Sequence, residues 1–170
     1  MRISVTEDGL RAPDGRRLRC ALGRGGIARA KREGDGVTPA GAWPMRRVLY
    51  RADRLSRPET ALPTAPIAED DGWCDDPADA AYNRPIKRPY AASHEAMWRE
   101  DGLYDVVVVL GHNDDPPAPG AGSAIFLHVA RPDYGPTEGC VALALPDLLD
   151  LLKRCGPETA LAVEAAQPPE

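Results

Sequence analysis

Proline is the residue that most limits what this chain can fold into. The 170 residues include 18 prolines, about twice the usual share, and most of them lie between positions 39 and 136. Proline locks φ and lacks an N–H group, so it ends helices and is excluded from central strands. The distribution rules out a helical bundle. It predicts a mostly β fold whose short strands are separated by long, proline-braced loops.

Length and charge restrict the domain organisation and the partners. A chain of 170 residues suits one core, so we expect a single domain over residues 1–170. Hydrophobic residues make up 43% and charged residues 28%, as in folded proteins rather than disordered ones. The net charge of −5 argues against nucleic acid as a partner. No stretch approaches the ~20 apolar residues of a membrane helix, so no transmembrane segment is expected.

The cysteines and the first residues of the chain suggest the cellular compartment in which the protein works. Cys20, Cys74, Cys140 and Cys155 could form two bridges in an exported chain. The opening residues, Met-Arg-Ile-Ser-Val-Thr, lack the apolar segment of a signal peptide, which predicts a cytoplasmic protein with reduced thiols. If a leader had been removed, the same chain would indicate the periplasm.

Apolar periodicity predicts the secondary structure. Residues 2–32 alternate around the turn at Asp14 and Gly15, which predicts a hairpin. Residues 53–90 lack periodicity and are expected to form a long surface loop over a binding groove. Ser93 caps an expected short helix over 93–99. Further strands are expected at 43–49, 105–111, 124–129, 141–143 and 159–163, with a second helix at 146–154. The result is a mostly β domain with one or two short helices and a long Pro-rich loop.

Two glycine clusters, at residues 23–26 and 34–41, invite comparison with phosphate-binding loops. Neither lies between a strand and a helix, and neither ends in the Lys-Ser or Lys-Thr pair of such loops. We therefore interpret both clusters as turns between strands.

Two of the three histidines are weak candidates for a functional site. His94 lies beside Glu95 in the expected helix, where adjacent residues do not share a face, so it is interpreted as a surface residue. His112 could form a metal site with Asp114 and His128, but the spacing matches no zinc signature. We expect no metal ion.

His128 is the stronger candidate, together with Cys140. It ends an apolar strand, where an imidazole without a partner would be unfavourable. It is therefore either a core residue bonded to a carbonyl group or a functional group. Gly139 precedes Cys140 and keeps the approach to the sulfur open, and an apolar strand anchors the turn from behind. This is the minimum arrangement for a cysteine nucleophile with its base.

These residues also carry a resemblance. Residues 122–128, Gly-Ser-Ala-Ile-Phe-Leu-His, and 137–141, Thr-Glu-Gly-Cys-Val, resemble the catalytic segment of the YkuD-type L,D-transpeptidase family. Residues 34–41 resemble its N-terminal hairpin, and 72–75 and 82–84 resemble the loop of its short members. The resemblance implies a β-sandwich-like catalytic domain in which the cysteine and the histidine face each other in a groove.

The resemblance also implies roles for individual residues. Cys140 would be the thiolate nucleophile and His128 its base, acting on peptidoglycan tetrapeptide stems at the bond before the terminal D-Ala. Thr137 and Gly139 would shape the turn, and the N–H groups of Gly139 and Cys140 would form the oxyanion hole. Carbapenems would acylate Cys140, and no cofactor is expected.

The chain departs from the family where the substrate carboxylate is bound. Many members carry an arginine two residues after the cysteine, where this chain has Ala142. We expect Arg131 or Arg84 to replace it, because a guanidinium group binds a carboxylate with two parallel hydrogen bonds. The other expected substrate-binding residues are Trp73, Tyr82 and Asn83.

The acyl-enzyme implied by the resemblance can react with water, with the amine of another stem, or with a free D-amino acid. A cytoplasmic enzyme would meet soluble stem peptides or muropeptides, so we expect L,D-carboxypeptidase activity that releases D-Ala during cell-wall recycling. Cross-linking or D-amino acid exchange in the periplasm is the alternative. A catalytically inactive module that binds peptidoglycan fragments is a second alternative.

Overall fold

The computed structural model describes residues 1–168. Within this range the chain forms three sheets and one helix, α1 (Leu145–Leu152). The mostly β prediction is confirmed. The strands are β1 (Arg2–Thr6), β2 (Gly9–Arg11), β3 (Arg17–Leu18), β4 (Cys20–Ala21), β5 (Ile27–Ala28), β6 (Thr38–Pro39), β7 (Gly41–Tyr50), β8 (Thr64–Pro66), β9 (Asp71–Cys74), β10 (Pro85–Lys87), β11 (His94–Ala96), β12 (Val106–Leu110), β13 (Phe126–Val129), β14 (Val141–Leu143) and β15 (Ala160–Val163).

The main sheet has ten strands and curls on itself. Its order is β3-β2-β1-β15-β7-β12-β13-β14-β4, and β8 pairs with β7 outside this path. Strands β3 and β4 lie at the two ends of this order, yet only Arg19 separates them in the chain. The sheet must therefore curl until its two edges approach each other, and β2 and β4 are indeed in contact.

Strand β12 lies in the middle of the main sheet and separates two hydrophobic cores. All five of its residues are buried, because both faces of the sheet are covered. Val106, Val108 and Leu110 belong to the core that also contains the buried leucines of α1. Val107 and Val109 point to the opposite face, as the twofold alternation of a strand requires.

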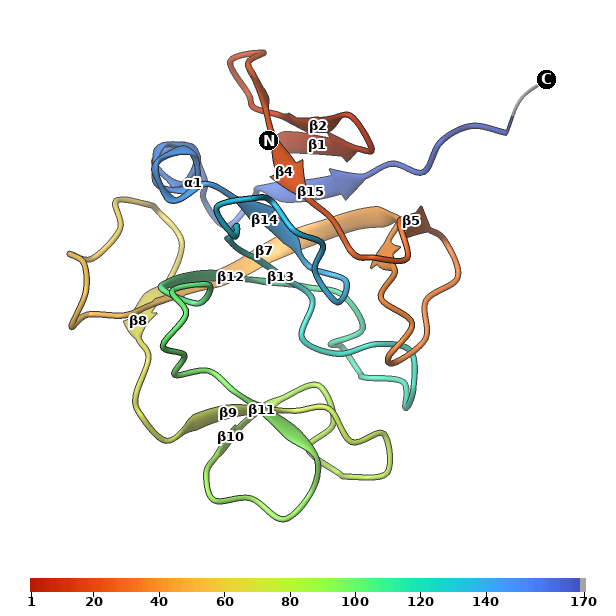
Figure 1. Cartoon of the computed structure of the whole chain (residues 1–170), viewed down its shortest axis with the longest axis vertical. Coiled ribbons are helices and arrows are strands. Elements are labelled where there is room, and N and C mark those ends of the chain that lie inside the picture. Colours follow the sequence, from red (N-terminus) through yellow and green to blue (C-terminus); the bar gives the residue numbers. More distant parts are fainter. Residues whose placement is uncertain (169–170) are drawn as a thin grey trace.

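The second core lies between the main sheet and a smaller sheet of order β10-β9-β11, which forms a separate layer (Figure 1). The ring of Trp73, from β9, meets the ring of Phe126, from β13, edge to face at 5.0 Å between centroids. Cys140 belongs to this core, at 7% exposure. Cys140, the candidate nucleophile, therefore lies where the two layers meet.

Several expected elements are confirmed. The strands expected at 43–49, 105–111, 124–129, 141–143 and 159–163 are β7, β12, β13, β14 and β15, and the helix expected at 146–154 is α1. The last strand pairs with the first in parallel, with Ile3 opposite Leu161. Among residues 1–168, no helix has the length and hydropathy of a membrane span.

Three expectations need correction. The predicted hairpin turn at Asp14 and Gly15 is present, between β2 and β3, but the chain also turns between β1 and β2, so the segment forms a three-stranded meander. Residues 53–90 are not one long loop, because they contain three strands. Strand β8 pairs with β7 of the main sheet, and β9 and β10 pair with each other. The helix expected over 93–99 is wrong. His94–Ala96 form β11, which pairs with β9, and this pairing between distant segments overrides the local helix signal.

Candidate active site

The pairing of β13 with β14 places Cys140 and His128 on one face of the main sheet. The two strands are parallel, and His128 lies opposite Ala142. Residues that pair directly share a face, and so do residues two apart in one strand. Cys140 directly precedes β14, two residues before Ala142, and its side chain continues the alternation, since Cys140, Ala142 and His128 all line the same cavity.

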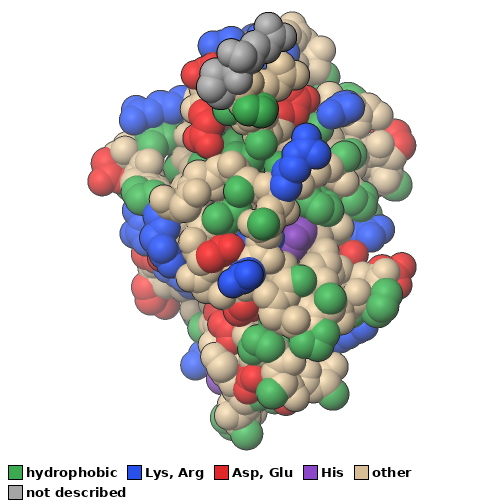
Figure 2. Space-filling model, turned by 90° about the vertical axis from the view of Figure 1, so that its right-hand side faces the viewer, with side chains coloured by type: hydrophobic (Ala, Val, Ile, Leu, Met, Phe, Trp, Pro, Cys, Tyr) green, Lys and Arg blue, Asp and Glu red, His purple; other side chains and the backbone are tan. Residues whose placement is uncertain are grey.

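Both side chains line one cavity of about 420 Å³ between the main sheet and the small sheet. Its walls carry an unusual number of ionisable groups: Lys31, Glu33, Asp75, Glu95, Arg99, Arg131 and Glu138. The face shown in Figure 2 is hollowed near its middle, where a histidine side chain shows among basic and acidic ones.

Backbone groups at the start of β13 hold the sulfur of Cys140. The Phe126 N–H donates to Sγ at 3.4 Å, and the thiol donates to the carbonyl oxygen of Ala124 at 3.2 Å. Ala124 has a φ of 53°, a left-handed conformation that is uncommon for a residue with a side chain. The residue whose carbonyl oxygen accepts the hydrogen bond from the thiol is thus held in an unusual conformation.

A backbone carbonyl orients His128. Its Nδ1 lies 2.9 Å from the carbonyl oxygen of Val129. A carbonyl oxygen can only accept, so Nδ1 carries the proton of the neutral ring and Nε2 is the basic nitrogen. The edge of the imidazole also contacts the ring of Tyr104, with 5.3 Å between centroids.

Burial keeps both reacting groups neutral in the resting site. It raises the pKa of the Cys140 thiol to about 12, against the opposing effect of the Phe126 N–H. It lowers the pKa of His128 to about 4. At neutral pH the site therefore holds a thiol and a neutral imidazole, and not an ion pair.

The nucleophile turn, residues 137–140, is closed by Thr137. Its hydroxyl group donates to the carbonyl oxygen of Cys140 at 2.6 Å and accepts from the Gly139 N–H at 3.1 Å. This fits the expected shaping role of Thr137. It also occupies the Gly139 N–H, so in this structure that amide does not point freely at an oxyanion.

The two glycine clusters pack directly behind this turn. A Cβ atom on Gly23 would lie 2.9 Å from Cα of Gly139 and 2.1 Å from the carbonyl oxygen of Gly36. The clusters are turns, as expected, but their glycines also allow three backbone segments to meet at the nucleophile turn.

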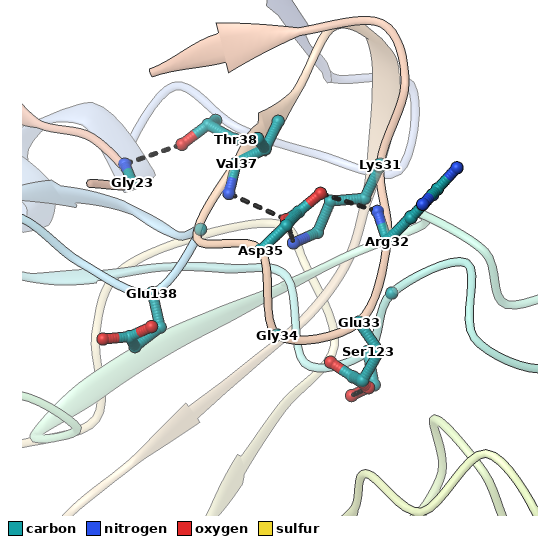
Figure 3. A network of polar contacts seen from close by, with 12 residues as sticks. Gly23, Lys31, Arg32, Glu33, Gly34, Asp35, Val37, Thr38, Ser123 and Glu138 are labelled. Atoms are coloured by element: carbon teal, nitrogen blue, oxygen red, sulfur yellow. Dashed lines mark hydrogen bonds and ion pairs between the residues drawn. The ribbon is translucent and has the colours of Figure 1, made fainter. Parts of the chain in front are cut away.

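The loop between β5 and β6 places a buried cation, Lys31, beside the nucleophile turn. The Lys31 side chain is 5% exposed, and its Nζ lies 2.6 Å from Oδ1 of Asp35. The other contacts of Asp35 are with the N–H groups of Arg32 and Val37, as Figure 3 shows. A methyl group on Gly139 would lie 3.5 Å from Lys31 Nζ. The ammonium group therefore lies beside the nucleophile turn and lowers the pKa of Cys140.

A carboxyl group and a phenol form the opposite wall. The hydroxyl group of Tyr104 donates to Glu95 Oε1 in a short hydrogen bond. Burial raises the pKa of Glu95 to about 6 and that of Tyr104 well above its usual value. Arg99 lies over the Tyr104 ring at 5.0 Å and pairs with Asp101.

Three of the expected substrate-binding residues lie behind the cavity wall. Trp73 donates to Oδ1 of Asn83, which also accepts from the Ala124 N–H. The Asn83 amide donates in turn to two loop carbonyls. The Tyr82 hydroxyl accepts from Gly122 and donates to Glu33. These contacts support the segment around Ala124, to which Cys140 is bonded.

The two expected arginines lie at different cavities. Arg131 is exposed and lines the cavity of Cys140. Arg84 lines a second cavity of about 300 Å³, with Arg46 and Arg47. The structure therefore brings only Arg131 to the candidate nucleophile.

The remaining histidines and cysteines lie elsewhere. His112 is 7% exposed, packs edge to face against Trp43 at 4.7 Å, and does not line the cavity of His128. His94 is half-buried and accepts a hydrogen bond from Arg88. Among residues 1–168, no group of three or more His, Cys, Asp or Glu side chains could hold a metal ion. All four cysteines are free thiols.

The sequence interpretation missed Lys31, Glu95, Arg99 and Tyr104 as cavity residues. Assigning residues 93–99 to a helix concealed Glu95, because only the pairing of β11 with β9 directs it into the cavity. Lys31 falls at the end of the segment interpreted as a hairpin, residues 2–32, and Glu33 directly precedes the second glycine cluster, so neither was considered for a site. In the sequence, a lysine and a glutamate beside a glycine cluster were the only signals of a site in this segment.

Comparison with known proteins relates the chain to a family. The family model described as YkuD, L,D-transpeptidase catalytic domain, matches residues 2–163. No curated protein and no solved structure shows a significant match.

Proposed function

Because the chain belongs to the YkuD family of L,D-transpeptidase catalytic domains, we propose that it is an L,D-carboxypeptidase. In this proposal it removes the terminal D-Ala from peptidoglycan tetrapeptide stems. The observation that carries the proposal is the shared cavity of Cys140 and His128, in which Nε2 is the basic nitrogen.

The first half-reaction uses these two residues. Sγ of Cys140 attacks the carbonyl carbon that precedes D-Ala, while its proton passes to Nε2 of His128. The tetrahedral intermediate collapses as the C–N bond breaks, and the imidazolium gives the proton to the leaving amine. D-Ala leaves, and the tripeptide remains as a thioester on Cys140. Because Lys31 lies beside the nucleophile turn, its charge stabilises the negative oxygen of the intermediate.

Water is proposed as the acceptor of the second half-reaction. A cavity of about 420 Å³ lies in the range of sites that enclose one small ligand. This size supports the binding of one stem end together with water, rather than of two stems at once. Hydrolysis of the thioester then yields the tripeptide and the free thiol.

Arg131 is proposed to bind the carboxylate of D-Ala. Ala142 stands beside His128 where many family members carry arginine, and Arg131 reaches the same cavity from the loop after β13. Arg131→Ala should raise KM for tetrapeptide about tenfold or more with a smaller change in kcat, since a charged hydrogen-bond pair is lost. A raised KM in Arg84→Ala, with Arg131→Ala unchanged, would instead place the carboxylate in the second cavity.

The deciding experiment incubates wild type and Cys140→Ala with disaccharide tetrapeptide and follows the products by mass spectrometry. We expect wild type to release D-Ala and Cys140→Ala to release none. A cross-linked dimer as the main product would establish transpeptidation instead. Stem-peptide binding by both proteins, with no turnover by either, would identify a binding module. Acylation of Cys140 by a carbapenem provides an independent check on the nucleophile.

A further inference from the structure

Glu95 is a half-buried acid in the cavity that the first half-reaction does not use. It lies in β11, paired with Trp73 of β9, and its carboxyl group lines the cavity of Cys140. Its hydrogen-bond partner is the hydroxyl group of Tyr104, which is 6% exposed. The charged groups around Glu95 are Arg99, Asp75 and Glu33. Arg99 forms its ion pair with Asp101.

This environment is unfavourable for a purely structural carboxylate. Enclosed carboxylates are normally paired with a cation, and removing one from water without such a pair destabilises the fold. A carboxylate also has about four acceptor positions, of which the Tyr104 hydroxyl fills one. An unpaired carboxyl group in a reactive cavity, with a pKa moved toward neutral pH, is typical of an acid–base group.

The cavity has a base on each of its two walls. His128 comes from β13 in the main sheet, beside Cys140, and Glu95 comes from β11 in the small sheet. His128 serves the thiol and the leaving amine. A water molecule that attacks the thioester from the side of the small sheet would approach through the part of the cavity that Glu95 lines.

We infer that Glu95 is the general base of the second half-reaction. This role rests on the proposed hydrolytic function. The carboxylate takes one proton from water as the water oxygen bonds to the thioester carbon. The intermediate then collapses, the C–S bond breaks, and the Cys140 sulfur leaves with the electron pair. The proton on Glu95 returns to that sulfur, so the products are the tripeptide acid and the free thiol.

The test compares the two half-reactions in wild type and Glu95→Gln. In Glu95→Gln, the tripeptidyl group should still form on Cys140 but should be hydrolysed about 10²-fold more slowly, the usual effect of losing a general base. The acyl-enzyme should therefore accumulate and be visible in the intact-protein mass after an acid quench. Hydroxylamine, which needs no base, should release the acyl group equally fast from both proteins. The matched control is Glu100→Gln, since Glu100 is 85% exposed and lies outside the cavity.

Tyr104→Phe supplies a second readout that does not depend on Glu95→Gln folding. It keeps the ring beside His128 but removes the hydroxyl group, whose hydrogen bond lowers the pKa of Glu95. Hydrolysis of the acyl-enzyme should increase with pH as Glu95 ionises, with a midpoint near the pKa of about 6 in wild type. In Tyr104→Phe this midpoint should move to higher pH. A midpoint that stays in place would count against the role of Glu95.

The outcomes separate the inference from the proposed function. Wild type that makes cross-linked dimer and no tripeptide overturns the hydrolytic function and, with it, this role. Wild type that hydrolyses normally, beside a Glu95→Gln variant that hydrolyses its acyl-enzyme within about twofold of the same rate, overturns only the role of Glu95.

Discussion

The backbone of the nucleophile turn leaves no room for a side chain at Gly139. Its φ is 140°, a value that L side chains rarely adopt, and a Cβ atom there would lie 2.8 Å from the carbonyl oxygen of Val37. The glycine before Cys140 is therefore required by the close approach of the loop before β6, in addition to leaving the sulfur open.

Gly139→Ala should lower the free energy of unfolding by roughly 3 kcal/mol and abolish D-Ala release, because strain and collision act together. Gly120→Ala is the matched control: Gly120 has a φ of 80°, and a methyl group there would meet no atom of a more distant residue within 4 Å. It should lose only about 1–2 kcal/mol and remain active. Thermal unfolding and the tetrapeptide assay measure both. Equal losses in the two variants would contradict the importance of the Val37 contact.

Lys31 should control the reactivity of Cys140 through its charge. The ammonium group lowers the pKa of the thiol, while the nearby Glu95 carboxylate raises it. Lys31→Met should therefore slow alkylation of Cys140 several-fold at a fixed pH, and Glu95→Gln should accelerate it. The rates of iodoacetamide labelling at Cys140 between about pH 7 and 9, around the ordinary thiol pKa, measure both effects. Changes of the same sign in both variants would contradict an electrostatic origin.

At the scale of elements, Asn83 ties the loop before β10 to the segment before β13. Its side chain accepts from Trp73 and from the Ala124 N–H, and it donates to the carbonyl groups of His112 and Asn113. Because the carbonyl oxygen of Ala124 accepts a hydrogen bond from the Cys140 thiol, Asn83 is linked to Cys140 through a single residue.

Asn83→Ala should therefore reduce both stability and turnover. Several buried polar groups lose their partner, at about 1–3 kcal/mol for each group left unsatisfied, and kcat should fall as Ala124 moves. Leu148→Ala, in α1 on the far core, is the contrasting variant. It should lose about 2–5 kcal/mol with kcat unchanged below its unfolding temperature. An Asn83→Ala variant that keeps full kcat would show that Ala124 needs no such support.

The elements that could be predicted from the sequence are those whose pattern is local. The continuous apolar run of β12 and the amphipathic α1, with a proline in its first turn, carry their signal within themselves. Residues 94–96 have no such local pattern. They form a strand only because they pair with the edge of β9, some twenty residues earlier in the chain. The candidate site divides in the same way. Cys140 and His128 were predictable from adjoining motifs, whereas Glu95 and Lys31 reach the cavity only through pairing between distant segments.

At the scale of the whole molecule, two buried histidines make the fold sensitive to acid. Burial lowers the pKa of both His112 and His128 from 6.5 to about 4. The folded state therefore binds fewer protons than the unfolded state in this window. The stability contributed by the two neutral rings is complete above pH 6.5 and is lost as the pH falls toward 4.

His112→Phe should reduce this acid sensitivity while keeping the edge contact with Trp43. Between pH 6.5 and 4, wild type should lose up to about 3 kcal/mol more stability than the variant. Glu95 has the opposite effect on stability between about pH 4.5 and 6, because its raised pKa means that the folded state binds the proton more readily than the unfolded state does. This contribution is the same in wild type and in His112→Phe, so it cancels in the comparison. Urea unfolding at several pH values gives the difference. Parallel curves for the two proteins would contradict it.

The position of Cys140 in the core between the two sheets has a consequence for protein engineering. Stabilising a protein usually means repacking its interior, but here one of the two cores contains the sulfur of the proposed nucleophile. Substitutions meant to improve packing around Trp73 or Phe126 would also change the polarity and rigidity around the thiol. The buried leucines of α1 belong to the other core and do not line the cavity of Cys140. A library aimed at heat tolerance should therefore draw its positions from around this helix, and not from Ile125 or Val141, which belong to the same core but adjoin the site.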